Sequence, residues 1–197
     1  MIRSPTMITR TIAAAPLLLT LALLMPAPAA AGPQDRPSAT DLRLGLVGQW
    51  SGALGYRDYQ TDALVEIPVT TTITTPGDGA TLVRQSLFDD GPSRPVWITT
   101  VSLDDPAAGT STSASFRAGR APELDTEAVR VGSVTDPTHW TLIYTRTGED
   151  DDAPADIRVT ETRDGYTLLE VKAVRPVGAD DAAWRFRNQT RLTRTGD

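Results

Sequence analysis

Apolar and polar residues alternate along most of the chain after residue 41, in short runs separated by turn residues. The period of two is clearest in three sets of residues: Val65, Ile67, Val69 and Ile73; Trp140, Leu142 and Tyr144; and Trp184, Phe186 and Leu192. Successive side chains of a β-strand point to opposite faces of its sheet. The pattern therefore predicts strands with one dry face and one wet face.

Turn clusters such as Pro76–Gly79 and Arg163–Gly165 separate about ten such strands. We expect them near residues 46–59, 63–75, 80–88, 95–103, 110–117, 127–134, 139–147, 155–162, 166–175 and 183–194. Short links between successive strands predict an all-β fold, an antiparallel up-and-down barrel of about 8–10 strands, with a β-sandwich as the alternative. Pro68 cannot donate to a ladder, so it predicts an edge position or a bulge. A helical turn is expected only around residues 180–183.

Residues 1–31 have the three-part composition of a secretory signal peptide. Arg3 and Arg10 make the first segment positively charged, and it contains no acidic residue. The apolar run that follows has about 14 residues, fewer than the roughly 20 needed to span a bilayer. Small residues then allow cleavage after Ala31 or after Ala29. We expect a cleaved signal peptide, a flexible leader over residues 32–40 and a barrel domain over residues 41–197. The product would be soluble and periplasmic or extracellular, with no stable membrane insertion after cleavage.

Composition excludes several classes of function. The chain has no cysteine and one histidine, so disulfides, thiolate sites and multi-histidine metal sites are excluded within one chain. Removal of residues 1–31 leaves 17 basic and 25 acidic residues, a net charge of −8. A surface of that sign repels nucleic acid, and we expect no nucleic-acid partner.

The start of the first strand, Leu46-Val47-Gly48-Gln49-Trp50, resembles the Gly-x-Trp motif of the lipocalins and related calycin barrels. With Tyr56-Arg57-Asp58-Tyr59 after it, the chain is similar to uncharacterised exported bacterial proteins with a calycin-like barrel. The resemblance implies that Trp50 plugs one barrel end and that an arginine of the last strand packs over its indole ring. Arg191 or Arg194 could be that arginine, and Gly48, Trp50 and Arg191 are the structural residues of this prediction.

A closed barrel of this size has room for one small ligand, and we expect a small apolar molecule in its interior. The aromatic residues that would line or plug the cavity are Trp97, Trp140, Tyr144, Trp184 and Phe186. Arg57 or Asp58 would orient a polar head group at the mouth. The alternative is an envelope structural or protein-interaction module with a filled core and no ligand.

Charged residues on the strands leave two questions open. His139 could bind haem in such a barrel, but alternation places it on the face opposite Trp140, so we expect a surface histidine and no cofactor or metal. Glu170 and Lys172 lie on one face of their strand, and we favour the other face as the core side. The sequence has no nucleophile elbow, paired-carboxylate motif or metal cluster, so we expect no catalytic residue.

Overall fold

The computed structural model describes residues 37–57, 61, 63–89, 91 and 95–196. The chain divides into two units, residues 1–34 and 35–197, and the described residues all belong to the second unit. The predicted signal peptide and the first part of the predicted leader, residues 32–36, lie outside the described residues. Within the described part of the chain, no helix is long and apolar enough to cross a membrane.

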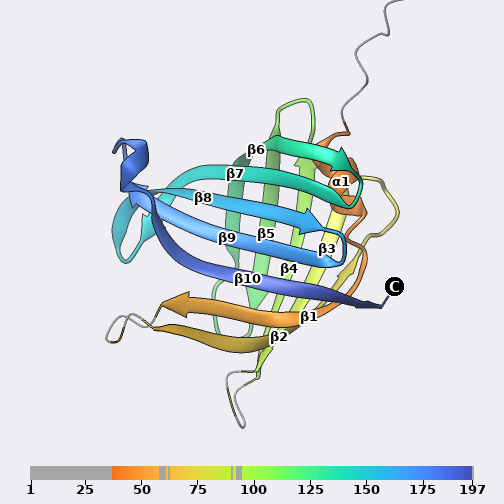
Figure 1. Cartoon of the computed structure of the whole chain (residues 1–197), viewed down its shortest axis with the longest axis horizontal. Coiled ribbons are helices and arrows are strands. Elements are labelled where there is room, and N and C mark those ends of the chain that lie inside the picture. Colours follow the sequence, from red (N-terminus) through yellow and green to blue (C-terminus); the bar gives the residue numbers. More distant parts are fainter. Residues whose placement is uncertain (1–36, 58–60, 62, 90, 92–94, 197) are drawn as a thin grey trace, which may run out of the picture. The chain divides into compact units, whose positions relative to one another are not determined.

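Ten antiparallel strands form a closed barrel in which each strand pairs with its neighbours in the chain and β10 closes on β1 (Figure 1). The strands are β1 (Gly48–Arg57), β2 (Leu64–Thr74), β3 (Thr81–Asp89), β4 (Pro95–Asp105), β5 (Thr110–Arg117), β6 (Glu123–Asp136), β7 (His139–Asp150), β8 (Ala153–Asp164), β9 (Thr167–Pro176) and β10 (Arg185–Gly196). The predicted up-and-down barrel is confirmed. The short helix η1 (Asp181–Ala183) lies where one helical turn was expected.

The alternation of β2 places its apolar face inside the barrel. Val69 and Ile73 are buried in the core, whereas Val65, nearer the end of the barrel where β2 starts, is 37% exposed. Pro68 pairs with Ala53 of β1, but the pairing of β2 with β3 begins only at Val69. Pro68 therefore has a local edge position, as its missing amide hydrogen predicts.

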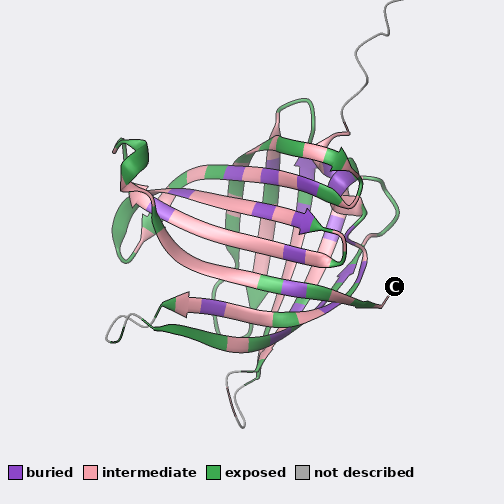
Figure 2. Cartoon of the chain, in the orientation of Figure 1, coloured by how far each residue is buried: buried purple, intermediate pink, exposed green. Residues whose placement is uncertain are grey.

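A six-residue helix, α1 (Ala39–Leu44), closes one end of the barrel, and the sequence analysis missed it. Its first turn is fixed by a capping box: Asp41 N donates to Ser38 Oγ at 3.1 Å, and Ser38 N donates to Asp41 Oδ2 at 3.0 Å. Leu42, and Leu46 just beyond the helix, pack in the core. Figure 2 shows buried residues on α1 and on the strand segments around it. Part of the predicted leader therefore belongs to the folded domain.

Strand β10 contains a bulge that changes which side chains face inward. Its pairing with β9 shifts register between Phe186 and Asn188. One extra residue reverses the alternation beyond it. Leu192 faces the core, whereas Phe186 pairs with Ala173 on the outer face. The prediction that Phe186 and Leu192 share a face is wrong for this reason.

The turn between β7 and β8 consists of Asp151 and Asp152, with φ of 56° and 60°. Both residues have left-handed backbone, which costs roughly 1–2 kcal/mol for an ordinary side chain and less for aspartate. Two-residue hairpins of this kind favour Asn-Gly. We expect the double substitution Asp151→Asn with Asp152→Gly to raise the free energy of unfolding by about 1 kcal/mol in urea denaturation.

The matched control for this turn is Asp151→Ala with Asp152→Ala. It removes the same two charges but keeps a Cβ at both left-handed positions, so it should not stabilise the barrel. An Asn-Gly variant no more stable than the Ala-Ala variant would show that the backbone of this turn stores no strain.

Candidate functional site

A cavity of about 210 Å³ lies inside the barrel, on the inner side of α1. Its charged and phenolic lining residues are Arg43, Arg84, Glu127, Tyr144, Glu161 and Glu170. The apolar part of the wall is formed by Leu46, Ile73, Leu82 and Val159. The barrel interior therefore has two parts, an apolar core and the cavity with its charged lining, which we call the polar chamber.

Arg84 of β3 holds two glutamates of the opposite wall. Its Nη1 lies 2.8 Å from Glu170 Oε2 and its Nη2 lies 3.0 Å from Glu161 Oε1. The hydroxyl of Tyr144 donates to the second oxygen of Glu161 at 3.0 Å. Burial alone would lower the pKa of Arg84, but the two carboxylates raise it above its ordinary value. Burial and the charge of Glu161 raise the pKa of Tyr144, which keeps its hydroxyl protonated.

Arg43 projects from α1 into the barrel and fixes the helix to β4 and β5. It pairs with Asp104 and donates to Ser102 at 2.7 Å and to Ser111 at 3.3 Å. Burial opposes its charge, but Tyr144 and the nearby carboxylates outweigh burial and raise its pKa. A buried arginine whose donors are matched in this way ties the helix to the polar chamber.

Of the carboxylates that line the cavity, Glu127 of β6 has the weakest contact with a cation. The nearest cation atom is Arg146 Nε at 3.4 Å, longer than a usual charged hydrogen bond. Arg146 Nε has no hydrogen-bond partner among the described residues. Burial raises the pKa of Glu127, Arg146 lowers it, and the charges of Asp125 and Glu170 raise it further. The net direction is upward, so the charged form of Glu127 is destabilised in this chamber.

Small hydroxyl side chains from β4 and β5 form the remaining wall. Thr100, Ser102, Ser111 and Ser113 line the cavity, and the register places Ser102 directly opposite Ser113. Short side chains on both members of a cross-strand pair leave space that larger residues would fill. The cavity thus exists because β4 and β5 contribute small polar side chains where a packed core would need apolar ones.

Trp50 plugs the end of the barrel, and the arginine over it is Arg194. The guanidinium carbon of Arg194 lies 5.7 Å from the centre of the indole ring, and Nη2 donates to Val47 O at 2.7 Å. Arg191 is exposed and pairs with Ala53 of β1. Gly48 has a φ of 139°, and a Cβ there would lie 2.8 Å from Gly196 O. The arrangement matches the expected plug, with Arg194 and not Arg191 as its cation.

Among the aromatic residues predicted to line the cavity, only Tyr144 does so. Trp140 is buried beside it in the core and donates from Nε1 to Pro137 O at 3.1 Å. Trp97 is 57% exposed, on the face of β4 opposite the cavity-lining Thr100 and Ser102. Trp184 packs against Arg158 and Arg175, whose guanidinium carbons lie 4.2 and 4.6 Å from the centre of its ring.

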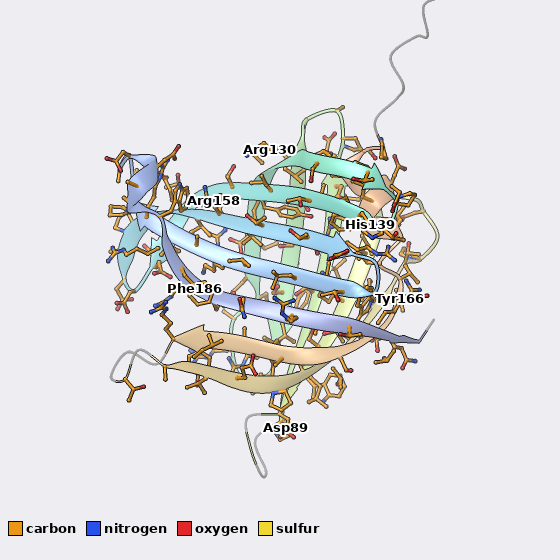
Figure 3. All side chains as sticks on the ribbon, viewed as in Figure 1. Asp89, Arg130, His139, Arg158, Tyr166 and Phe186 are labelled. Atoms are coloured by element: carbon orange, nitrogen blue, oxygen red, sulfur yellow. The ribbon has the colours of Figure 1, made fainter. Side chains whose placement is uncertain are left out.

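The predicted polar residues also lie away from the cavity. Arg57 and Phe186 line a separate depression with Leu64 and Gln189, and Asp58 lies outside the described residues. His139 is at the surface near the α1 end of the barrel (Figure 3), with Nδ1 2.8 Å from Asp136 Oδ2. Hydrogen bonds from Thr138, and then His139, lower the pKa of Asp136 to about 2. His139 is therefore not placed to ligate a haem in the cavity.

Sequence reasoning missed the charged lining, and for Glu170 it chose the wrong face. Glu170 points into the barrel beside Leu168 and Val174, because the even-numbered residues of β9 face inward. Period-two alternation carried the signal: Arg84 shares the face of Leu82, and Glu161 shares that of Ile157. In the sequence, the charged lining could have been recognised from charged residues that lie an even number of positions from buried apolar residues of the same strand.

No family model matches this chain, and no curated protein sequence is similar to it. Among solved structures, the chain is similar to the crystal structure of Rv2717c from M. tuberculosis, at 16% identity and a TM-score of 0.51, over 81% of this chain and 99% of that one. A DUF3598-family protein of unknown function from Nostoc punctiforme PCC 73102 aligns at 8% identity over 81% of this chain and 100% of that one, but with a TM-score of only 0.25. The first similarity shows a shared barrel fold and fits the calycin-like architecture that Gly48 and Trp50 predict.

Proposed function

We propose that this chain is an exported barrel protein that binds a small polar molecule in its interior cavity. The observation that supports the proposal is the charged and hydroxyl lining of an interior that apolar residues could fill. Buried ion pairs are often no more stabilising than well-packed apolar side chains. A chain that keeps Arg43, Arg84, Glu127, Glu161 and Glu170 inside its barrel therefore has a reason other than stability to do so.

The lining favours a polar ligand over the apolar one expected from the sequence. An apolar body in the cavity would remove water from Glu127 and the serine hydroxyls without replacing its hydrogen bonds, which is costly. The volume of about 210 Å³ is also below the roughly 300–1,000 Å³ of ordinary ligand pockets. A compact molecule with several hydrogen-bonding groups fits both the polar lining and the small volume of the cavity.

Export rests on the predicted signal peptide and has its own test. N-terminal sequencing of the protein recovered from a bacterial periplasm or culture medium should begin at Gly32, or at Ala30 for the other cleavage site. A product that keeps its first 31 residues would remove export from the proposal and leave the cavity argument intact.

A second candidate function is a protein-interaction module without a ligand. Large apolar side chains are exposed on β4 to β6: Trp97, Leu103, Phe116 and Leu124. Such residues on a barrel exterior are typical of contact surfaces. This function predicts that the cavity stays filled with water and that no small molecule copurifies.

We expect the purified exported form to carry or bind a small polar compound, seen as a mass increment in native mass spectrometry that disappears on denaturation. Ser113→Leu should fill the cavity and abolish the increment. Thr112→Leu, at the preceding residue, which is exposed on the outer face of β5, is the matched control and should keep it. Equal retention by both variants would place the ligand elsewhere, and no increment in the parent protein would favour the interaction module.

A further inference from the structure

We infer that the ligand of this cavity is a small organic cation, a primary amine that also carries hydroxyl groups, with Glu127 and Glu170 as the partners of its ammonium. This inference rests on the proposed function and names its ligand class. It follows from which polar groups of the lining are already engaged and which are not.

The two arginines of the cavity are engaged by the protein itself. Arg43 donates to Asp104, Ser102 and Ser111, and Arg84 donates to both Glu161 and Glu170. An anionic ligand would have to displace a carboxylate from one of these guanidinium groups. The lining is therefore poorly suited to an anion.

Carboxylate oxygens remain available on two sides of the chamber. Glu170 uses Oε2 for Arg84, and its Oε1 has no hydrogen bond within the described residues. Glu127 has only the long contact with Arg146. A carboxylate offers about four acceptor positions, so both residues have spare capacity for N–H donors.

Charge in the lining points the same way. Two arginines and three glutamates line the cavity, an excess of one negative charge. Glu127 and Glu170 line the same cavity, and the charge of Glu170 contributes to the upward shift of the pKa of Glu127. An ammonium bound in this cavity would be attracted by both carboxylates, in a chamber that screens charge less than water does.

The serine wall suits the rest of the molecule. Ser102 and Ser111 accept from Arg43, so each hydroxyl hydrogen is free to donate to a ligand oxygen. Ser113 makes no side-chain hydrogen bond to any described residue. Among the described residues, Tyr144 is the one aromatic side chain of the lining, which is too little for the aromatic cage that a quaternary ammonium needs. In the described part of the chain, no group of three or more acidic or histidine residues is placed to hold a metal ion.

The test uses the purified exported protein, cleared of copurifying compounds by dialysis from mild denaturant, with matched small probes. Ethanolamine and 2-amino-1,3-propanediol are the amines, ethylene glycol and glycerol the neutral matches, and glycolate the anion. We expect the amines to raise the Tm in thermal denaturation and the neutral and anionic probes to leave it unchanged. Glu127→Gln should weaken amine binding, measured by calorimetry, roughly tenfold or more.

Glu127→Gln should also raise the Tm of the ligand-free protein, because it removes a partly buried charge whose nearest cation atom lies 3.4 Å away. Glu170→Gln is the second variant and should weaken the amines too, whereas Glu66→Gln, at an exposed position of β2, should not. Binding of glycolate or glycerol in preference to the amines would overturn the cation class and keep the ligand cavity. Failure of every probe, together with an empty protein in native mass spectrometry, would overturn the cavity function itself.

Discussion

Replacement of Arg84 by methionine is expected to lower the free energy of unfolding by about 3–5 kcal/mol. Arg84 is the cation that both Glu161 and Glu170 contact inside the barrel. The side chain of Glu161 is only 4% exposed, so without Arg84 its charge would stay buried with a single hydrogen bond from Tyr144. Glu170 is partly exposed and can turn toward water, so most of the loss should come from Glu161. Urea denaturation at neutral pH measures the effect.

Two controls separate the buried charge from the loss of side-chain packing. Arg84→Met combined with Glu161→Gln should recover much of the lost stability, because the uncompensated charge is gone. Arg130→Met, at an exposed position of β6 (Figure 3), should change stability by no more than about 0.5 kcal/mol. A loss as small as that of Arg130→Met would mean that the ion pairs do not organise the chamber.

The strands could be predicted because their inner and outer residues differ strongly in polarity over most of their length. Trp140, Leu142 and Tyr144 occupy every second position at the start of β7, and all three are buried. Turn residues predict the strand ends to within a few positions. Because the connections between strands are short, each strand is expected to pair with the next one in the chain. These are local signals, and a meander needs little else, because each strand pairs with its neighbours in the chain.

The candidate site could not be predicted in the same way because its lining contradicts the usual rule that charged residues face water. Burial statistics place Glu170 on the outer face, whereas the structure pairs it inside the barrel with Arg84, 86 positions earlier in the chain. A contact between strands so far apart leaves no mark in the local pattern of either. The lining is visible in the sequence only as charged residues in phase with a core face.

The structure differs from the sequence-based prediction in two further places, the inner face of β10 and the helix α1, and each difference has a local cause. The bulge in β10 is a feature of the backbone, and one inserted residue moved Phe186 outward. The helix α1 has only six residues, too few for a periodic pattern, and its stability comes from its cap and from Leu42 and Arg43 inside the barrel. Ser38 followed by Asp41 was the one signal for it, and a Pro- and Ala-rich context concealed that signal.

Trp50→Ala is expected to destabilise the barrel by about 3–5 kcal/mol, through loss of buried apolar surface and the cavity that remains. The indole is 1% exposed, lies under Arg194, and donates from Nε1 to Leu46 O at 2.8 Å. Leu46 also lines the cavity, so the same tryptophan holds the segment that closes the chamber. Chemical denaturation should show the full loss, and Trp50→Phe, which keeps an aromatic ring but leaves Leu46 O without its donor, should lose about 1–3 kcal/mol.

Trp97→Ala is the matched control, because it removes the same side chain from a site that is 57% exposed on the outer face of β4. Its loss should be well under half that of Trp50→Ala, since less apolar area returns to water and no internal void forms. Arg194→Met should lose about 0.5–2 kcal/mol, because the indole stays in place while the cation above it and its hydrogen bond to Val47 O are removed. If Trp50→Ala and Trp97→Ala cost the same, Trp50 does not act as a plug, and the position of Leu46 over the chamber must be maintained by α1 and Arg43 alone.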